Sequence, residues 1–256
     1  ECIHTYSLIH DDLPAMDNDD YRRGKLTNHK VYGDGMAILA GDGLLTYAFQ
    51  LCSENTTASA EQKIKAIQCL ATAAGPEGMV GGQAFDLLSE GKHIPLKELK
   101  VLHSGKTGAL FNASVELGLI LGNADTNTRT ALMEYANCLG LLFQITDDIM
   151  DYCETTETTG KPVGNDLREG LLTYPLLSIV NDDNKDTLLA DIKALNHGGN
   201  EQDIIDYVIA QGGIDNTLAV ADKYCKDALA ALTAIRDFPG KEFLVMTVEN
   251  LANRKV

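Results

Sequence analysis

Apolar residues recur at intervals of three and four along most of the chain, which is the spacing of helices that bury one face. The run over 36–52, MAILAGDGLLTYAFQLC, also carries small residues where another helix can approach closely. The pattern predicts further helices, separated by Gly, Asn and Pro, over 63–74, 96–103, 109–121, 129–149, 174–180, 201–211 and 215–238. No alternating pattern of a β-strand competes with it, so we predict an all-α fold.

Three further expectations follow from the pattern along the chain. Ile3, Tyr6, Ser7 and His10 share one helical face with no capping residue before them, so we expect an N-terminal segment to be missing before residue 1. The stretch 154–171, rich in Thr and Gly, is the longest irregular segment and is predicted to be a mobile loop. Nothing in the pattern demands two domains, so we predict a single domain over 1–256.

Composition narrows the function. The 256 residues are 45% hydrophobic, enough for a sizeable core, and the formal net charge is −16. Because no broad cationic face is available to neutralise phosphates, we expect no nucleic-acid partner. The six cysteines lie far apart without a Cys-x-x-Cys motif, which indicates reduced thiols and a cytoplasmic protein. No uninterrupted apolar run reaches about twenty residues, so we expect no stable membrane anchor.

Two aspartate clusters end apolar helical runs. The first is DDLPAMD, in which Asp11 and Asp17 are six residues apart and Pro14 breaks the helix, so that the chain can turn and bring Asp17 back. The second is DDIMD, in which Asp147 and Asp151 are four apart and share one helical face. Most acidic runs are solvated helix ends, but two buried by apolar helices favour a site for divalent ions, with Mg²⁺ open to substrate phosphate.

Basic residues lie where a phosphate group would need them. Arg22 and Arg23 follow the first cluster, and their planar guanidinium groups suit a diphosphate. Lys106 lies at a junction of two predicted helices and Lys161 in the predicted loop. Each alone is typical of a solvated surface, and only the combination points to a diphosphate ligand.

The order of these motifs resembles that of the trans-prenyl diphosphate synthases, the bacterial farnesyl-diphosphate-forming enzymes in particular. The segments that carry the resemblance are YSLIHDDLPAMDNDDYRRG at 6–24, AGD at 40–42, GGQAFD at 81–86, KTGA at 106–109, FQITDDIMD at 143–151 and Gly160-Lys161. The resemblance implies a helical bundle of the isoprenoid synthase type with the active site in a central cavity. It also implies a homodimer.

The resemblance implies the chemistry as well. An allylic diphosphate would be held by three Mg²⁺ ions, two at Asp11 and Asp17 and one at Asp147, while Arg22, Lys106 and Lys161 add positive charge. Together they would stabilise the departing diphosphate as the C–O bond ionises.

The remaining roles follow from the same resemblance. Thr107 and Gln144 would offer neutral dipoles to the carbocation. Isopentenyl diphosphate, placed by His4 and Arg23, would attack with its double bond, and the released diphosphate would take the proton. Without the resemblance, His4 and Gln144 are more typical of ordinary helix residues.

Two positions depart from the family pattern. The Gly-Lys-x-x-Arg-Pro segment of the family lies upstream of the first cluster and is absent here, so these 256 residues by themselves are expected to be inactive. Where farnesyl diphosphate synthases commonly carry a second loop lysine, this chain reads Gly170-Leu171-Leu172. Arg168 is a candidate substitute. Gln83 and Asp86 either line the site or cap a helix kink.

Product length depends on what closes the pocket below the first cluster. Tyr6 and Ser7, five and four residues before Asp11, lie about one turn down the same helix. A bulky Tyr6 favours a C15 product, and a C20 product is the alternative.

Other functions stay open. A non-catalytic subunit of a heteromeric synthase would keep the same motifs. A terpene cyclase shares the fold, but its second metal site mixes Asn, Ser and Glu. A ferritin-like di-iron protein belongs to a different class and would use the Glu-x-x-His pairs at Glu1–His4 and Glu90–His93, which need regular core helices.

Overall fold

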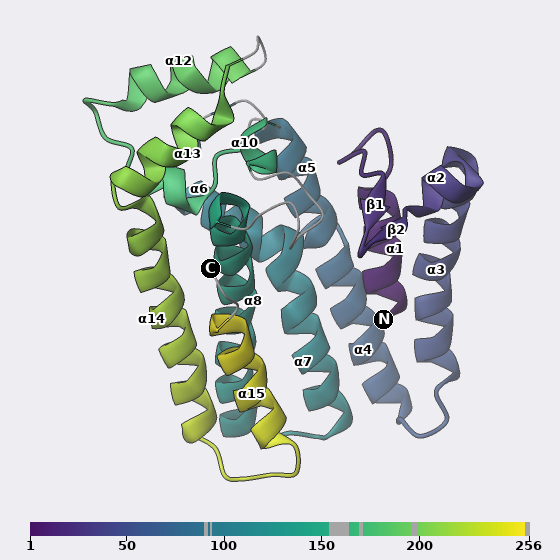
Figure 1. Ribbon diagram of the computed structural model, residues 1–256. Helices are drawn as coiled ribbons and strands as arrows, with labels where there is room; N and C mark the ends of the chain where they lie inside the picture. The colour runs from purple at the N-terminus through teal and green to yellow at the C-terminus, as the bar shows by residue number, and fades with distance from the viewer. Residues whose placement is uncertain (90–91, 93, 154–163, 169–170, 196–198, 254–256) are drawn as a thin grey trace.

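The computed structural model describes residues 1–256 apart from 90–91, 93, 154–163, 169–170, 196–198 and 254–256. Helices make up most of the described chain and run side by side as a bundle (Figure 1), which confirms the all-α prediction. In chain order the described elements are α1 (Cys2–Asp11), β1 (Tyr21–Arg22), β2 (Lys25–Leu26), α2 (Asn28–Tyr32), α3 (Asp34–Glu54), α4 (Ala60–Ala74), α5 (Met79–Ser89), α6 (Leu96–His103), η1 (Ser104–Gly108), α7 (Ala109–Leu121), α8 (Thr126–Cys153), α10 (Asn165–Arg168), α11 (Tyr174–Leu177), α12 (Lys185–Leu195), α13 (Glu201–Ala210), α14 (Gly213–Thr233) and α15 (Lys241–Ala252).

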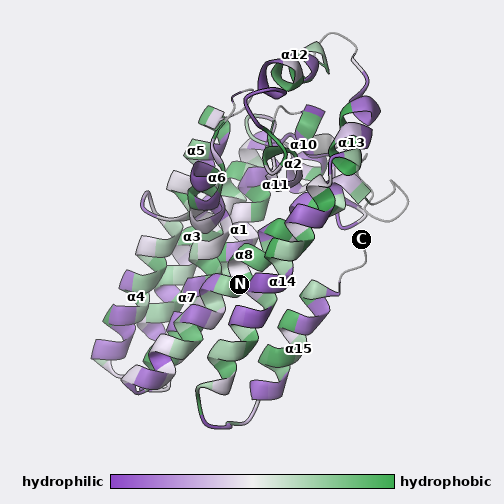
Figure 2. Cartoon of the chain, turned by 90° about the vertical axis from the view of Figure 1, so that its left-hand side faces the viewer, coloured by the Kyte–Doolittle hydropathy of each residue, from purple (hydrophilic) through white to green (hydrophobic). Residues whose placement is uncertain are grey.

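Two apolar cores hold the bundle together. The smaller core joins α1, α3, α4 and α5 through side chains such as Tyr6, Ala48, Leu70 and Met79. The larger core is built mainly from α6, α8, α11, α13, α14 and α15. Helix α7 contributes to both, because Leu110 and Leu117 pack on the smaller core and Phe111 on the larger one. Figure 2 shows hydrophobic and hydrophilic residues alternating along the helices, as expected where each helix buries one face.

The predicted helices are present, and two of them end three or more residues earlier than expected. Helix α14 stops at Thr233 rather than at residue 238, because its last turn closes with hydrogen bonds from Ala234 N–H to the Ala231 carbonyl and from Ile235 N–H to the Leu232 carbonyl. Helix α11 stops at Leu177 rather than at residue 180. The side chain of Asn181 accepts hydrogen bonds from the backbone N–H groups of Asp183 and Asn184, which form a turn instead.

Several elements were not predicted. Helices α2, α5, α12 and α15 were missed, and α10 lies inside the stretch expected to be irregular. The hairpin of β1 and β2 pairs Tyr21 with Leu26 and Arg22 with Lys25, so each strand is too short to show an alternating pattern. Most of the predicted loop, including Lys161, lies outside the described residues.

Helix α3 is unusually exposed for its hydrophobicity. By length and composition alone, this helix is long and apolar enough to cross a membrane, and only 17% of its apolar window is buried. Its apolar residues are interrupted by Gly, Thr, Gln and Asp42, so no uninterrupted apolar run of about twenty residues occurs here, although the mean hydropathy is high enough to pass this test. One such helix is weak evidence for a membrane, since a core helix of a soluble protein and a signal sequence pass the same test. Met36, Leu39 and Tyr47 are 59%, 63% and 47% exposed.

Candidate active site

The first aspartate cluster forms where α1 ends. Helix α1 stops at Asp11, and the backbone N–H of Asp17 donates to the Asp11 carbonyl at 2.9 Å. Asn18, at a φ of 53°, closes the same turn by donating its N–H to the Leu13 carbonyl at 3.1 Å. The predicted return of Asp17 toward Asp11 is therefore confirmed.

Helix α3 fixes the last turn of α1. The ring of His10 lies against Gly41, where an added Cβ would be 2.0 Å from His10 Nε2. The same nitrogen lies 3.0 Å from the Ile38 carbonyl oxygen. Only glycine admits the ring at this position, so Gly41 allows the close contact that places the residues leading to Asp11.

Arg22 turns back from β1 onto the first cluster. Its Nε and NH2 groups lie 2.7 and 2.6 Å from Asp12 Oδ1, and NH2 also lies 3.6 Å from Asp11 Oδ2 and 3.9 Å from Asp19 Oδ2. Burial alone would lower the pKa of Arg22, but Asp12, Asp11 and Asp19 together raise it. The residue predicted to bind diphosphate thus also neutralises the acidic cluster.

Lys106 reaches the first cluster from η1, a π-helical turn between α6 and α7. Such turns occur frequently at functional sites. The Lys106 Nζ lies 2.5 Å from Asp86 Oδ2 on α5. Burial alone would lower the pKa of Lys106, but the charges of Asp86, Asp11 and Asp17 outweigh burial and raise it. Burial raises the pKa of Asp11, and Lys106 and Arg22 oppose that effect.

A glycine contact allows η1 to lie against α5. A Cβ added at Gly82 would be 2.1 Å from the backbone nitrogen of Lys106. Any side chain at this position would push the two backbones apart and move Asp86 away from Lys106. The GGQAFD motif therefore supplies both the contact and the carboxylate. Asp86 thus pairs with Lys106, one of the predicted site residues, and its lining of the site stays a prediction.

The second cluster lies on α8. Asp148 is buried, accepts a hydrogen bond from the Tyr174 backbone N–H at 3.0 Å and has its pKa raised by burial to about 8. Asp147 beside it is exposed to solvent. A carboxylate that serves the fold and a carboxylate that can meet a ligand are therefore adjacent in the chain, and Asp147 is the one predicted as a metal ligand.

The segment from α6 into η1 links the two clusters. The His103 Nε2 lies 3.8 Å from Asp148 Oδ1, and Lys106 lies three residues later beside Asp86, Asp11 and Asp17. His103 is buried, and burial together with the Lys106 charge lowers its pKa to about 4. Asp148 of the second cluster and the aspartates of the first cluster therefore lie near two side chains that are three residues apart in this segment.

The other predicted residues are distributed more widely. Thr107 is half-buried next to Lys106, and Gln144 is half-buried on α8, one turn before Asp147. His4 is exposed on α1, and Ser7 donates its hydroxyl to the His4 carbonyl at 2.9 Å. Arg23 is exposed at the tip of the hairpin, with a φ of 52°. Among the described residues, no hydrogen bond or ion pair joins His4 to Arg23.

Tyr6 and Arg168 have well-defined surroundings. Tyr6 is 5% exposed and packs in the smaller core, with its ring edge against His10 at a centroid distance of 5.7 Å. The guanidinium of Arg168 is ion-paired with Glu201 on α13, and its Nε donates at 3.1 Å. The structure thus gives Arg168 a partner on α13, and its role as a substitute loop cation stays a prediction.

The donor set fits a hard divalent ion bound together with a ligand. Among the described residues, no group of three or more His, Cys, Asp or Glu side chains forms a ready metal cage. The exposed and half-buried carboxylates of Asp11, Asp17 and Asp147 supply oxygen ligands only, which Mg²⁺ prefers. The remaining coordination positions of the ion would have to be filled by oxygen atoms of a diphosphate and of water.

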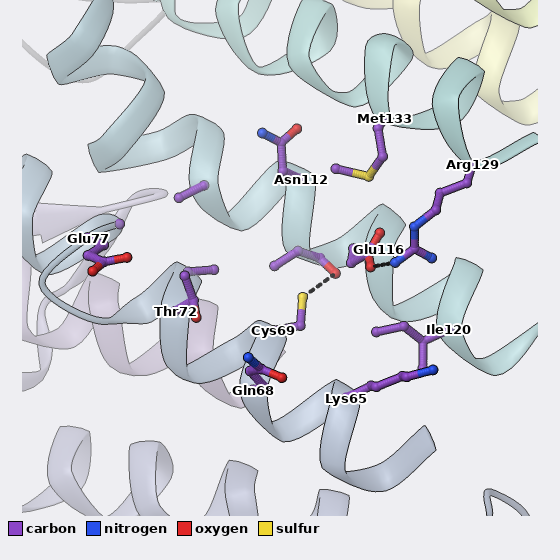
Figure 3. Close-up of a pocket in the computed structure, with 14 residues that line it drawn as sticks. Lys65, Gln68, Cys69, Thr72, Glu77, Asn112, Glu116, Ile120, Arg129 and Met133 are labelled. Carbon is purple, nitrogen blue, oxygen red and sulfur yellow. Dashed lines mark hydrogen bonds and ion pairs between the residues drawn. The ribbon is translucent and has the colours of Figure 1, made fainter. Parts of the chain in front are cut away.

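A separate cavity of about 500 Å³ lies between α4, α7 and α8 (Figure 3). Arg129 and Glu116 form an ion pair in its wall, and the Cys69 thiol lies 4.0 Å from the Ala113 carbonyl oxygen. None of the predicted site residues lines this cavity. It therefore adds no group to the site built around the two clusters.

Comparisons with known proteins agree with these motifs. The sequence profile of the polyprenyl synthetase family matches residues 1–211. The chain is 56% identical over 179 residues to the farnesyl diphosphate synthase of Geobacillus stearothermophilus, which covers 69% of this chain and 60% of the relative. It is 45% identical over 203 residues to geranylgeranyl pyrophosphate synthase 7 of Arabidopsis thaliana, which covers 77% of this chain and 58% of the relative. The chain thus spans about three fifths of the length of these curated relatives.

Solved structures share the fold. A geranylgeranyl pyrophosphate synthetase from Pyrococcus horikoshii superposes with a TM-score of 0.86 at 33% identity, covering 99% of this chain and 77% of that one. A geranyltransferase from Helicobacter pylori, solved with magnesium and isoprenyl diphosphate, superposes with a TM-score of 0.73 at 30% identity. The match covers 98% of this chain and 71% of that one. The similarity extends over the whole helical bundle.

Proposed function

The chain belongs to the polyprenyl synthetase family, and we propose that its protein condenses isopentenyl diphosphate with dimethylallyl or geranyl diphosphate to give farnesyl diphosphate and diphosphate. The observation that carries the proposal is the placement of two aspartate clusters around the α6–η1 segment, with Lys106 beside Asp11 and Asp17. An allylic diphosphate needs both acidic metal ligands and cations, and this segment brings the two together.

Mg²⁺ would be held by Asp11, Asp17 and Asp147, three ions in all, and would supply the charge that stabilises a departing diphosphate. The chain's own cations complete that charge. Lys106 is held in place by Asp86, so its ammonium is oriented before a substrate arrives. Arg22 holds the first cluster together through Asp12 and adds to the positive potential, and Lys161 is proposed as a further cation.

Neutral groups would face the organic part of the substrate. The hydroxyl of Thr107 and the side-chain amide of Gln144 offer dipoles without a basic nitrogen that could trap a carbocation. His4 and Arg23 are proposed to place isopentenyl diphosphate, whose double bond attacks the allylic carbon. The released diphosphate takes the proton, so the mechanism requires no side-chain base.

The product is proposed to be the C15 diphosphate. Tyr6 is buried one turn before the first cluster, with Ser7 next to it, so its ring occupies the direction in which a growing chain would extend. The match to a farnesyl diphosphate synthase supports this length. The matches to geranylgeranyl pyrophosphate synthases make a C20 product the second candidate.

A subunit role is the other candidate. The chain is 46% identical over 181 residues to the large subunit 1 of a heterodimeric geranylgeranyl pyrophosphate synthase of Arabidopsis thaliana. The ferritin-like alternative has no such support. His4 is exposed, and Glu90 and His93 lie outside the described residues.

We further propose a cytoplasmic homodimer in which α3 packs on a second copy of the chain. Its exposed side chains Met36, Leu39 and Tyr47 form an apolar strip that is costly to leave in water. A second copy would bury this strip without a membrane.

The test is an assay of the full-length natural protein, rather than of these 256 residues alone, with Mg²⁺, isopentenyl diphosphate and either dimethylallyl or geranyl diphosphate, with products identified by mass. A C15 diphosphate that disappears on chelation and in Asp11→Ala supports the proposal. The control variant is Asp182→Ala, which removes an exposed acid of the same kind far along the chain and should leave the product unchanged. No condensation with the catalytic motifs intact would favour the subunit role.

A further inference from the structure

The hairpin that carries Arg22 is hydrogen-bonded at its base to Thr27, which in turn contacts His29. The proposed mechanism uses neither residue. Both side chains are buried, Thr27 at 3% exposure and His29 at 6%. The Thr27 hydroxyl lies 2.7 Å from the Asp19 carbonyl oxygen and 3.1 Å from His29 Nδ1. The two residues therefore link the start of α2 to the chain just after the first aspartate cluster.

The hydrogens of this link can be assigned. A hydroxyl has one hydrogen, and the 2.7 Å contact with the Asp19 carbonyl requires it, because a carbonyl oxygen only accepts. The Thr27 oxygen must then accept from His29, so Nδ1 carries the imidazole hydrogen. In the neutral ring Nε2 is left as a buried acceptor, and it has no hydrogen-bond partner among the described residues.

That orphaned acceptor is a cost that an apolar residue of similar size would avoid. A histidine kept here for packing alone would be a poor choice, because a leucine would fill the space without a buried polar atom. The hydrogen bond to Thr27 is what the histidine provides and a leucine does not.

The link lies at the base of the hairpin that carries Arg22. Thr27 holds the carbonyl of Asp19 through its hydroxyl and that of Asp20 through its backbone N–H, at 3.0 Å. These two carbonyls are the base of the β1–β2 hairpin, in which Arg22 pairs with Lys25. From that strand the guanidinium reaches Asp12 at 2.6 Å and Asp11 at 3.6 Å.

We propose that Thr27 and His29 are positioning residues, which orient Arg22 on the first aspartate cluster. Through Arg22 they set the affinity of this cluster for Mg²⁺ and diphosphate. The proposal rests on the proposed function for its ligand. Neither residue touches that ligand, and each acts through the hairpin and Arg22.

The test compares Thr27→Val, which keeps the shape and removes the hydroxyl, with Thr27→Ser, which keeps the hydroxyl. Calorimetry of the full chain with Mg²⁺ and inorganic diphosphate measures affinity, and thermal unfolding measures stability. We expect Thr27→Val to weaken binding five- to tenfold and Thr27→Ser to weaken it less than twofold. His29→Leu should behave as Thr27→Val, while His29→Asn, which retains a donor nitrogen, should recover part of the affinity.

A double variant separates positioning from general destabilisation. Because Thr27 acts through Arg22, adding Thr27→Val to Arg22→Gln should weaken binding no further than Arg22→Gln alone. The proposal would be overturned if the losses of affinity in the two single variants multiplied in the double variant. It would also be overturned if Thr27→Val lowered the melting temperature but left the affinity unchanged.

Hydrogen exchange gives a readout that does not depend on the ligand. Thr27→Val should speed amide exchange over 19–26 and leave α8 unchanged. If the wild-type chain binds no Mg²⁺–diphosphate, the proposed function fails, but exchange still decides on the link. If the amides of 19–26 exchanged as slowly in Thr27→Val as in the wild-type protein, Thr27 would not hold the hairpin.

Discussion

The ammonium of Lys106 lies 2.5 Å from the carboxylate of Asp86, twenty residues earlier in the chain. The carboxylate comes from α5 and the ammonium from η1, and the two backbones approach closely because Gly82 has no side chain. The same ammonium is within electrostatic reach of Asp11 and Asp17. Asp86 therefore holds a cation at the edge of the first aspartate cluster.

Replacing Asp86 should disturb the reaction through Lys106. In Asp86→Asn the ammonium loses its ion-pair partner but keeps the attraction of Asp11 and Asp17, so it should move toward the positions where metal ions would bind. A small displacement of a catalytic group can lower the rate about 100-fold, and we expect kcat/KM to fall by about 10- to 100-fold. Steady-state kinetics with geranyl diphosphate measures this change.

The matched variant is Asp86→Glu, which keeps the charge but lengthens the side chain. It should retain more activity than Asp86→Asn, because Lys106 still has an anionic partner on α5. Equal activity of Asp86→Asn and the wild-type protein would contradict the proposed role of this pair.

Asp12 is expected to serve stability rather than metal binding. Asp12 is 4% exposed, and its Oδ1 accepts a hydrogen bond from Arg22 Nε and forms an ion pair with Arg22 NH2. Asp12→Asn removes the charge from these bonds, and hydrogen bonds to charged groups contribute about 1.5–3 kcal/mol. We therefore expect the free energy of unfolding, measured in urea, to fall by about 2 kcal/mol.

An exposed ion pair in the same region provides the comparison. Asp20 pairs with Lys30 at 2.8 Å, and both side chains are well exposed. Asp20→Asn should therefore change the free energy of unfolding by less than about 1 kcal/mol. If the two variants lost the same stability, burial of the Arg22–Asp12 pair would not matter as argued.

Arg23 combines backbone strain with a proposed role in binding isopentenyl diphosphate. Its φ of 52° lies in the left-handed region, where ordinary residues are disfavoured by about 1–2 kcal/mol and asparagine is better tolerated. Arg23→Asn should therefore be more stable than Arg23→Ala by about 1 kcal/mol, because both lose the side-chain cation and only alanine keeps the strain.

The KM for isopentenyl diphosphate should not vary with the free energy of unfolding between Arg23→Asn and Arg23→Ala. Both variants should raise the KM for isopentenyl diphosphate about tenfold, corresponding to a loss of about 1.4 kcal/mol of binding. Unfolding in urea and steady-state kinetics measure the two effects separately. A KM that tracked stability across the two variants would assign Arg23 to the fold instead.

Local features of the site were predictable from the sequence, and contacts between distant segments were not. The turn at Pro14 and the shared face of Asp147 and Asp151 follow from helix geometry over a few residues. The pairing of Asp86 with Lys106 depends on how α5 meets η1. No local pattern encodes that contact, and Gly82, which permits it, and its neighbour Gly81 also weaken the helical signal of α5.

The same limit applies around Arg22. The sequence pointed to its charge, but its position depends on a hairpin of two-residue strands and on a hydrogen bond between Thr27 and His29. Strands this short carry no period, and a lone histidine in a polar stretch gives no signal of burial. Such contacts emerge only when the helices that bury them are in place.

Tyr6 offers the sharpest test of product length. Its ring is buried in the smaller core and lies edge-on to His10, one residue before Asp11. Tyr6→Ala opens space below the first cluster, so we expect the main product to change from the C15 to the C20 diphosphate. Truncating a buried aromatic residue also costs about 3–5 kcal/mol, so the assay should be run well below the melting temperature of the variant.

Two further variants separate volume from chemistry at this position. Tyr6→Phe keeps the ring and removes only the hydroxyl, so its product should remain C15. Ser7→Ala changes a half-buried neighbour whose hydroxyl donates to the His4 carbonyl, and it should lengthen the product little because almost no volume is removed. If Tyr6→Ala still gave only the C15 diphosphate, another residue would have to close the pocket, since the Tyr6 ring would then not limit chain growth.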